Sequence, residues 1–141
     1  MSVQLLIYPM FALFLLTMII MFLMLHFRIR AVRTRKVSPR YFKLNKGGDI
    51  PDHLVAISQN YNNLLELPIL FYVICLVAIA MNVEIENFGI YAWLFVVFRY
   101  IHSLIHITYN HILHRLGIFA VSSIILISMW VKVLMFVTST T

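Results

Sequence analysis

Four long apolar stretches run along the chain, separated by short polar segments. They cover roughly residues 4–27, 53–81, 88–113 and 117–138, and all four are dominated by aliphatic and aromatic side chains. Each stretch exceeds the about 20 residues that an α-helix needs to cross the hydrocarbon core of a bilayer. The pattern therefore predicts an all-α fold, in which residues 1–141 form one integral membrane four-helix bundle.

The segment between the first two stretches, residues 28–52, is strongly basic. It holds eight of the eleven Lys and Arg residues of the chain, and Pro39 and Pro51 interrupt it, as do Gly47 and Gly48. Because excess Lys and Arg keep a short loop in the cytoplasm, we expect this loop to be cytoplasmic and both chain termini to lie outside. We also expect anionic membrane lipids to be partners of the loop.

Composition excludes several classes of protein. Hydrophobic residues make up 62% of the chain and charged residues only 11%, which is far from the composition of a soluble domain. The formal charge of +6 is concentrated in the loop, so we expect no nucleic-acid partner. Cys75 is the single cysteine, which leaves neither a disulfide framework nor a cysteine-based metal site.

Polar residues interrupt the second and third apolar stretches, on one face of each predicted helix. At about 100° per residue, each set falls within an arc of roughly 100°. The residues are Gln59, Asn62, Asn63 and Glu66 on the second helix, and Arg99, His102, His106, Tyr109 and Asn110 on the third. The sequence therefore predicts one polar seam between these two helices.

The two helices are expected to be antiparallel, so residues at equal distance from their shared loop lie at equal depth. An ionised group in hydrocarbon costs about 3 kcal/mol on insertion scales, so the charged residues should turn inward and pair. The seam is a candidate functional site, although a pair that only fixes helix register is an alternative. The predicted pairs are Glu66 with Arg99, Asn63 with His102, and Gln59 with His106.

A metal or haem site is a further alternative. His102 and His106 are four residues apart, and Glu66 is at hand as a third ligand. The sequence nevertheless lacks the Glu-x-x-His pair of di-iron helical bundles, and the residues level with both histidines are amides. We therefore expect no metal.

Two motifs in the seam carry a resemblance to a known family. Asn63-Leu-Leu-Glu66 is similar to the Asn-x-x-Glu signature on helix two of the MAPEG family, the membrane-associated proteins of eicosanoid and glutathione metabolism. Arg99-Tyr-Ile-His102, with Arg115 further on, is similar to helix three of its prostaglandin-E-forming branch. The resemblance covers nearly the whole chain.

A third stretch, Arg33 with the Lys-Val-Ser-Pro that ends at Pro39, is similar to the Arg-Val-Ser-Pro stretch of the leukotriene-forming branch. Two positions depart from the family pattern. Gln59 stands where an arginine is expected, and His106 stands where a tyrosine is expected. The His-rich third helix looks like the bacterial branch, which implies a multi-pass protein of the bacterial inner membrane.

The resemblance implies a homotrimer that binds glutathione between subunits, near the cytoplasmic side. Glu66 would contact the amino group of glutathione and Asn63 its backbone or a carboxylate. Arg115, at the cytoplasmic end of helix three, would stabilise the thiolate. Further contacts to the cofactor are expected from Arg99, His102, His106, Gln59 and Arg33.

Two functions follow from these observations. One is a glutathione-dependent transferase or peroxidase that acts on lipophilic electrophiles dissolved in the bilayer, because a guanidinium lowers the pKa of a nearby thiol. The alternative is a non-catalytic membrane module that binds a lipid, a quinone-like ligand or a partner helix. Gln59 and His106 favour the alternative, since they remove a charge and a hydroxyl from the enzyme pattern.

Overall fold

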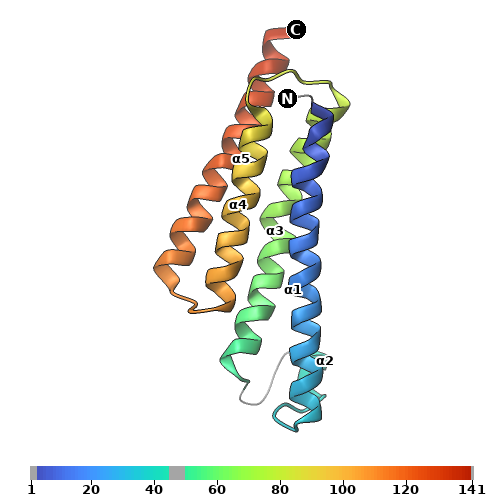
Figure 1. Cartoon of the computed structure of the whole chain (residues 1–141), viewed down its shortest axis with the longest axis vertical. Coiled ribbons are helices and arrows are strands. Elements are labelled where there is room, and N and C mark those ends of the chain that lie inside the picture. The colour runs from blue at the N-terminus through green and yellow to red at the C-terminus, as the bar shows by residue number, and fades with distance from the viewer. Residues whose placement is uncertain (1–2, 45–49, 141) are drawn as a thin grey trace.

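The computed structural model describes residues 3–44 and 50–140, and most of these residues are helical (Figure 1). The described part contains no strand. Its elements are η1 (Val3–Leu6), α1 (Ile7–Arg33), α2 (Tyr41–Leu44), α3 (Asp52–Ala80), α4 (Phe88–Ile107) and α5 (Ile112–Thr140). The helices α1, α3, α4 and α5 are long and apolar enough to cross a membrane, which confirms the predicted all-α membrane fold.

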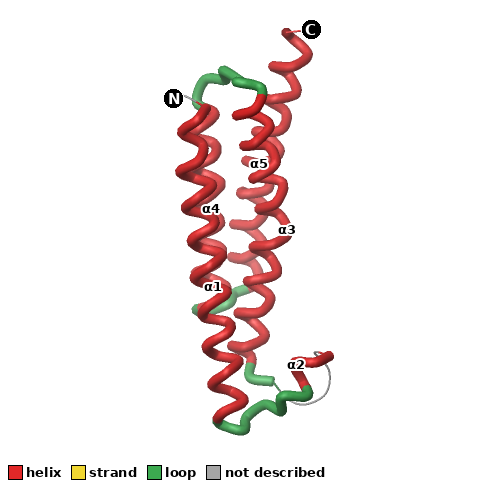
Figure 2. Tube along the Cα trace, turned by 90° about the vertical axis from the view of Figure 1, so that its right-hand side faces the viewer, coloured by secondary structure: helices red, strands yellow, loops and turns green. Residues whose placement is uncertain are grey.

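The four long helices pack as an antiparallel bundle (Figures 1 and 2). The closest pairs are α4 with α5 and α1 with α3, and α3 also packs against both α4 and α5. Both chain termini and the α3–α4 connection lie at one end, here called the termini end. The basic segment with α2 and the α4–α5 connection lie toward the other, here called the basic end, where α1 and α3 reach further than α4 and α5.

Several helix limits differ from the predicted ones. The first helix continues beyond residue 27 to Arg33, because Arg30 and Arg33 are favourable near the negative end of a helix dipole. The Thr34 amide and hydroxyl then both donate to the Arg30 carbonyl, each at 2.9 Å, and end the helix. Lys46, Gly47 and Gly48 of the predicted loop lie outside the described residues.

The third helix ends at Ile107 rather than at residue 113, and the fourth begins at Ile112 rather than at residue 117. Asn110 adopts a left-handed conformation with φ of 48°, which asparagine tolerates better than most residues. The backbone N–H of Asn110 donates to the Ile105 carbonyl at 2.8 Å and closes the turn. Arg115, predicted at the end of the third helix, therefore lies in the first turn of α5.

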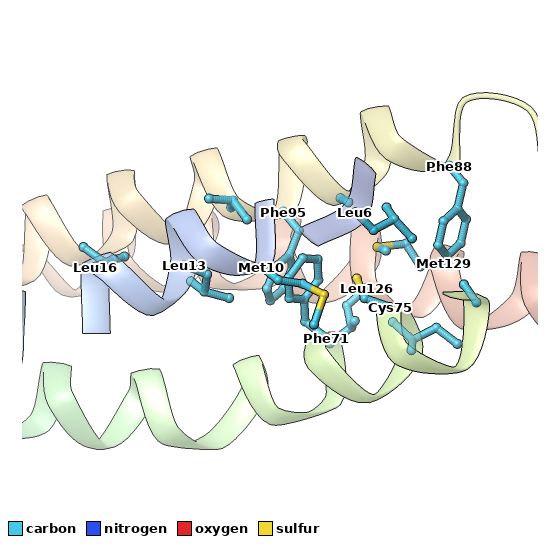
Figure 3. Close-up of a cluster of buried hydrophobic side chains, with 14 of the residues drawn as sticks. Leu6, Met10, Leu13, Leu16, Phe71, Cys75, Phe88, Phe95, Leu126 and Met129 are labelled. Atoms are coloured by element: carbon cyan, nitrogen blue, oxygen red, sulfur yellow. The ribbon is translucent and has the colours of Figure 1, made fainter. Parts of the chain in front are cut away.

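A continuous apolar core is centred in the half of the bundle nearer the termini end (Figure 3). The rings of Phe71 and Phe95 stack there, with their centroids 4.6 Å apart, and Leu13 and Met129 are fully buried beside them. Cys75 belongs to the same core as a free thiol with no exposed surface. The bundle is therefore held by apolar packing at this end, and its buried polar groups are found toward the basic end.

Candidate functional site

The polar face of α4 is turned into the bundle. Arg99 and His106 have no exposed surface, and His102 and Ser103 are exposed by only 3% and 1%. On α3 the one fully buried polar residue among those described is Asn60. The sequence therefore predicted correctly that Arg99, His102 and His106 face inward, as the cost of polar groups in hydrocarbon requires.

The side-chain contacts between α3 and α4 differ from the predicted pairs. The Asn60 amide donates to the Ser103 hydroxyl at 2.7 Å, and this hydroxyl lies 2.9 Å from the Asn60 side-chain oxygen, to which it donates. One Arg99 nitrogen, Nη2, donates to the backbone carbonyl of Asn63 at 2.7 Å. The predicted alignment of α3 and α4 along the bundle is thus correct to within about one helical turn. The hydrogen bonds between the two helices are nevertheless made by other residues than the predicted ones.

The reason for the difference is the rotation of α3. Ile57, Leu64 and Phe71 face the bundle together with Asn60, so at about 100° per residue the buried side of α3 is centred roughly 140° from the predicted polar arc. The polar arc is consequently turned outward. The buried aliphatic positions of this helix are the sequence signal that would have identified Asn60.

Glu66 is exposed, and within the described residues it is not in ion-pair contact with Arg99, which corrects the predicted pair. Arg99 instead lies with its guanidinium carbon 6.0 Å from the centroid of the Phe119 ring of α5. Its Nε and Nη1 atoms are buried without a hydrogen-bond partner. The charge of Glu66 acts on Arg99 only from a distance.

A cavity of about 250 Å³ opens between α3, α4 and the first turns of α5. Its lining combines the polar Asn63, His102 and Arg115 with apolar side chains of α5, namely Ile112, Leu116 and Phe119. Ile112 and Leu116 are 74% and 61% exposed on the outer surface of the subunit. A ligand in this cavity would therefore meet the guanidinium of Arg115 and the exposed apolar side chains of α5.

Arg115 is held in place from both its side chain and its backbone. Its Nη1 donates to the Asn110 side-chain oxygen at 2.7 Å, so the turn that ends α4 also orients the guanidinium. Its backbone carbonyl lies 3.2 Å from the His102 Nδ1. Since a carbonyl only accepts, the His102 Nδ1 carries the hydrogen and donates it, which fixes the orientation of the imidazole.

Several buried nitrogens around this cavity keep unused hydrogen-bonding capacity. They belong to four side chains of α4 and α5 and are Nε and Nη1 of Arg99, Nε2 of His102, both ring nitrogens of His106, and Nε of Arg115. Buried polar atoms in proteins almost always have a partner in a protein group, a ligand or water. This cluster is thus suited to a polar, anionic ligand or to ordered water.

A second cavity, of about 230 Å³, lies on the other side of α3, against α1 and α2. Gln59 and Asn62 line it together with Arg28. Arg28 donates to the Ser58 hydroxyl at 3.1 Å, and its guanidinium carbon lies 5.4 Å from the centroid of the Phe42 ring. Gln59 therefore lines a cavity to which the fully buried His106 does not belong, and both ring nitrogens of His106 lack a hydrogen-bond partner, contrary to the predicted pairing.

The predicted site residues are thus divided within one subunit. Asn63, His102 and Arg115 share one cavity, with Arg99 and His106 buried near it on α4. Gln59 lines the cavity of Arg28, and Glu66 and Arg33 are exposed. The described residues contain no group of three or more His, Cys, Asp or Glu side chains placed to hold a metal ion.

Comparison with known proteins agrees with the motifs. A model of the MAPEG family matches residues 6–135, a range that includes α3, α4 and both cavities. No curated protein and no solved structure matches the chain.

Proposed function

Because the chain belongs to the MAPEG family, we propose that it is a membrane-embedded enzyme that uses glutathione against lipophilic electrophiles. The observation that carries the proposal is the cavity in which Arg115, His102 and Asn63 meet. Its polar residues lie beside apolar side chains that are exposed on the surface of the single chain. A water-soluble thiol and a lipid-soluble acceptor could therefore reach it from different sides.

The charges around the cavity suit a tripeptide with two carboxylates and one amino group. Arg115 and Arg99 are cationic, and no acidic side chain lines the cavity. Glu66 lies three residues beyond Asn63 on α3 and is exposed, which leaves its carboxylate available to the amino group of the ligand. Charge-assisted hydrogen bonds of this kind are about twice as strong as neutral ones.

In the proposal, Arg115 activates the thiol of glutathione. A thiolate, not a thiol, is the nucleophile, and a nearby guanidinium lowers the pKa of the thiol by favouring its charged form. In the proposed reaction the thiol proton leaves to water, and the thiolate sulfur forms a bond to an electrophilic carbon of the acceptor. The bond from that carbon to its leaving group breaks, and the leaving group departs with the electron pair, as chloride does from a chlorodinitrobenzene. The hydrogen bond to Asn110 keeps the guanidinium in place during this step.

The division of the candidate residues between two cavities and the exposed surface supports a site completed between subunits. Gln59 and Glu66 are exposed in the single chain, and Arg33 ends α1 with an exposed side chain. In a homotrimer, as expected for this family, such residues of one subunit could contact a ligand held in the cavity of the next. The proposal also includes a cytoplasmic basic end in a bacterial inner membrane, because glutathione would arrive from the cytoplasm.

The position of Gln59 favours a second candidate function. It brings no charge to the predicted site, and it lines the cavity of Arg28 rather than that of Arg115. A module that only holds a lipid or a partner helix would not need the missing charge.

Glutathione titration of the purified protein in detergent tests the proposal, by calorimetry and by the shift in unfolding temperature. We expect binding at millimolar glutathione or below, and conjugation of a model electrophile such as a chlorodinitrobenzene. Arg115→Ala should lower the conjugation rate by about 100-fold, as expected for the loss of one preorganised donor to a developing charge. Arg40→Ala is the matched control, because Arg40 is exposed and lines neither cavity.

The two candidate functions predict opposite results. A folded protein that binds no glutathione, or one that conjugates equally well with and without Arg115, would exclude the proposed enzyme. S-methylglutathione should bind without reacting, which separates recognition of the tripeptide from chemistry at its sulfur.

A further inference from the structure

A third cavity lies at the basic end, between the last turns of α1 and the beginning of α3. It has a volume of about 270 Å³ and is separate from the two cavities described above. Its lining residues are Phe27, Arg30, Ala31, Thr34, Lys36, Pro51 and His53. The proposed glutathione reaction uses none of them.

The polar side chains of this cavity favour an anion. Arg30 and Lys36 are cationic and exposed, and His53 is a further nitrogen donor. Among the described residues the lining includes no acidic side chain, while the exposed Asp52 lies in the first turn of α3 between the lining residues Pro51 and His53. Thr34 donates its hydroxyl hydrogen to the Arg30 carbonyl at 2.9 Å, so its oxygen is left only as an acceptor. The donors available to a ligand are therefore the two cations and the imidazole.

The backbone around the cavity adds to this preference. The terminal carbonyls of α1 are satisfied internally, because the Ala31 carbonyl accepts the Lys36 amide at 3.0 Å and the Arg30 carbonyl accepts from Thr34. The 29-residue helix α3 begins directly after Pro51, and its positive dipole end is at the cavity. The negative end of α1 is thus covered, whereas the positive end of α3 is near the lining.

The depth of the cavity indicates the source of the anion. On α1 the large apolar residues Phe22, Leu25 and Ile29 are 61%, 49% and 45% exposed, as expected for a surface that faces lipid chains. Arg30 follows immediately, and basic residues continue from there. The cavity consequently lies where the lipid-facing surface ends, which is the level of the lipid headgroups.

We propose that this cavity, with Arg30, Lys36 and His53, binds the phosphate headgroup of an anionic phospholipid such as phosphatidylglycerol. A volume of about 270 Å³ is slightly below that of pockets for drug-sized ligands, about 300–1,000 Å³, so it fits a headgroup while the acyl chains stay in the bilayer. The lipid would join the end of α1 to the beginning of α3 at the basic end. The inference is independent of the proposed function, because it involves other residues.

The test uses the full-length protein in nanodiscs of phosphatidylcholine with increasing phosphatidylglycerol, and native mass spectrometry counts the phosphatidylglycerol retained per chain. The test variant is Arg30→Gln/Lys36→Gln. The control is Arg40→Gln/Lys43→Gln, which removes the same charge from exposed residues of the same basic segment that line none of the three cavities. All four residues are exposed, so neither variant should disturb the core.

We expect the wild type and the control to retain one phosphatidylglycerol per chain in preference to phosphatidylcholine. The Arg30/Lys36 variant should bind it about 100-fold more weakly, since it loses two charge-assisted hydrogen bonds to the phosphate, each of which contributes a factor of about ten. Equal losses in both variants would overturn the site and indicate a diffuse surface charge. Equal retention of the two lipids would also overturn it.

Inorganic phosphate and glycerol 1-phosphate form the second arm of the experiment. The proposed lipid site should retain phosphatidylglycerol in the presence of millimolar inorganic phosphate or glycerol 1-phosphate, because the acyl chains hold the headgroup in place. Displacement by either anion at micromolar concentration would overturn the lipid assignment and identify a site for a soluble phosphate.

Discussion

Asn60 and Ser103 join α3 to α4 through two buried hydrogen bonds, of 2.7 Å and 2.9 Å. Since Asn60 must face α4 to make them, the neighbouring arc with Gln59, Asn63 and Glu66 is turned toward the edge and surface of the subunit. This buried pair and the apolar residues on the same side of α3 thus together determine which residues of α3 can contact a ligand.

The first prediction concerns this pair. Asn60→Ala should lower the free energy of unfolding by about 1–2 kcal/mol, because the buried Ser103 hydroxyl loses its partner. Ser103→Ala should have a similar effect, and the double variant should cost less than the sum of the two. The free energy of unfolding of the two single variants and the double variant is measured in detergent by titration with sodium dodecyl sulfate. Strictly additive effects would contradict an interaction between Asn60 and Ser103.

Replacement of Arg99 by methionine should separate stability from ligand binding. Arg99 is fully buried with one hydrogen bond at 2.7 Å and no ion pair among the described residues, so an apolar side chain of similar length should leave stability unchanged or raise it by up to about 2 kcal/mol. Glutathione affinity should fall by about 10-fold or more with the loss of a charged hydrogen-bond donor.

The matched control for Arg99→Met is Lys132→Met, since Lys132 also lies over an aromatic ring, 5.0 Å from the centroid of Tyr91. The unfolding temperature and the glutathione titration are compared for both variants. An Arg99→Met protein that fails to fold would show that the guanidinium is a structural element of the bundle.

Gln59→Arg tests whether the missing charge limits cofactor binding. If glutathione bridges two subunits, an arginine at this exposed position should tighten its binding by about 5-fold, the effect of one additional exposed charge contact. Asn62→Arg is the control, because Asn62 lines the same cavity three residues, or about one helical turn, further along α3. Calorimetric titration with glutathione measures the affinity of both variants. An equal gain in affinity would indicate only a general effect of positive charge.

Cys75 should be unreactive in the folded protein. The thiol has no exposed surface and packs in the core with Phe71 and Met129. Ser139→Cys provides a reference thiol, because Ser139 is exposed. In mild detergent a maleimide should label this reference thiol while Cys75 stays unlabelled. Complete labelling after denaturation is the control, and rapid labelling of the native protein would contradict the packing of the core.

The orientation in the membrane can be tested with the same reagents. In a Cys75→Ala background, an impermeant maleimide applied to intact spheroplasts should label Ser139→Cys at the termini end and leave Lys43→Cys unlabelled. The basic segment would then be cytoplasmic, as its excess of Lys and Arg predicts. The reverse pattern would contradict both this orientation and the proposed direction of glutathione access.

Much of the architecture was determined by local properties of the sequence. The lengths of the apolar stretches predicted four membrane helices, since hydrocarbon tolerates no unpaired backbone. The same cost of polar groups in hydrocarbon predicted that Arg99, His102 and His106 would be buried. The limits of α4 and α5 were wrong by several residues, because the turn at Asn110 depends on a local backbone conformation that hydropathy does not describe.

The pairing of the candidate site was decided only by the tertiary structure. Rotation of α3 by roughly 140° from the predicted arrangement brings Asn60 to Ser103 and moves Glu66 away from Arg99. A helical wheel records angles within one helix, but the rotation of one helix against another depends on how all the side chains pack between them. The sequence by itself determined which residues are polar, and the packing of Ile57, Leu64 and Phe71 determined where those residues point.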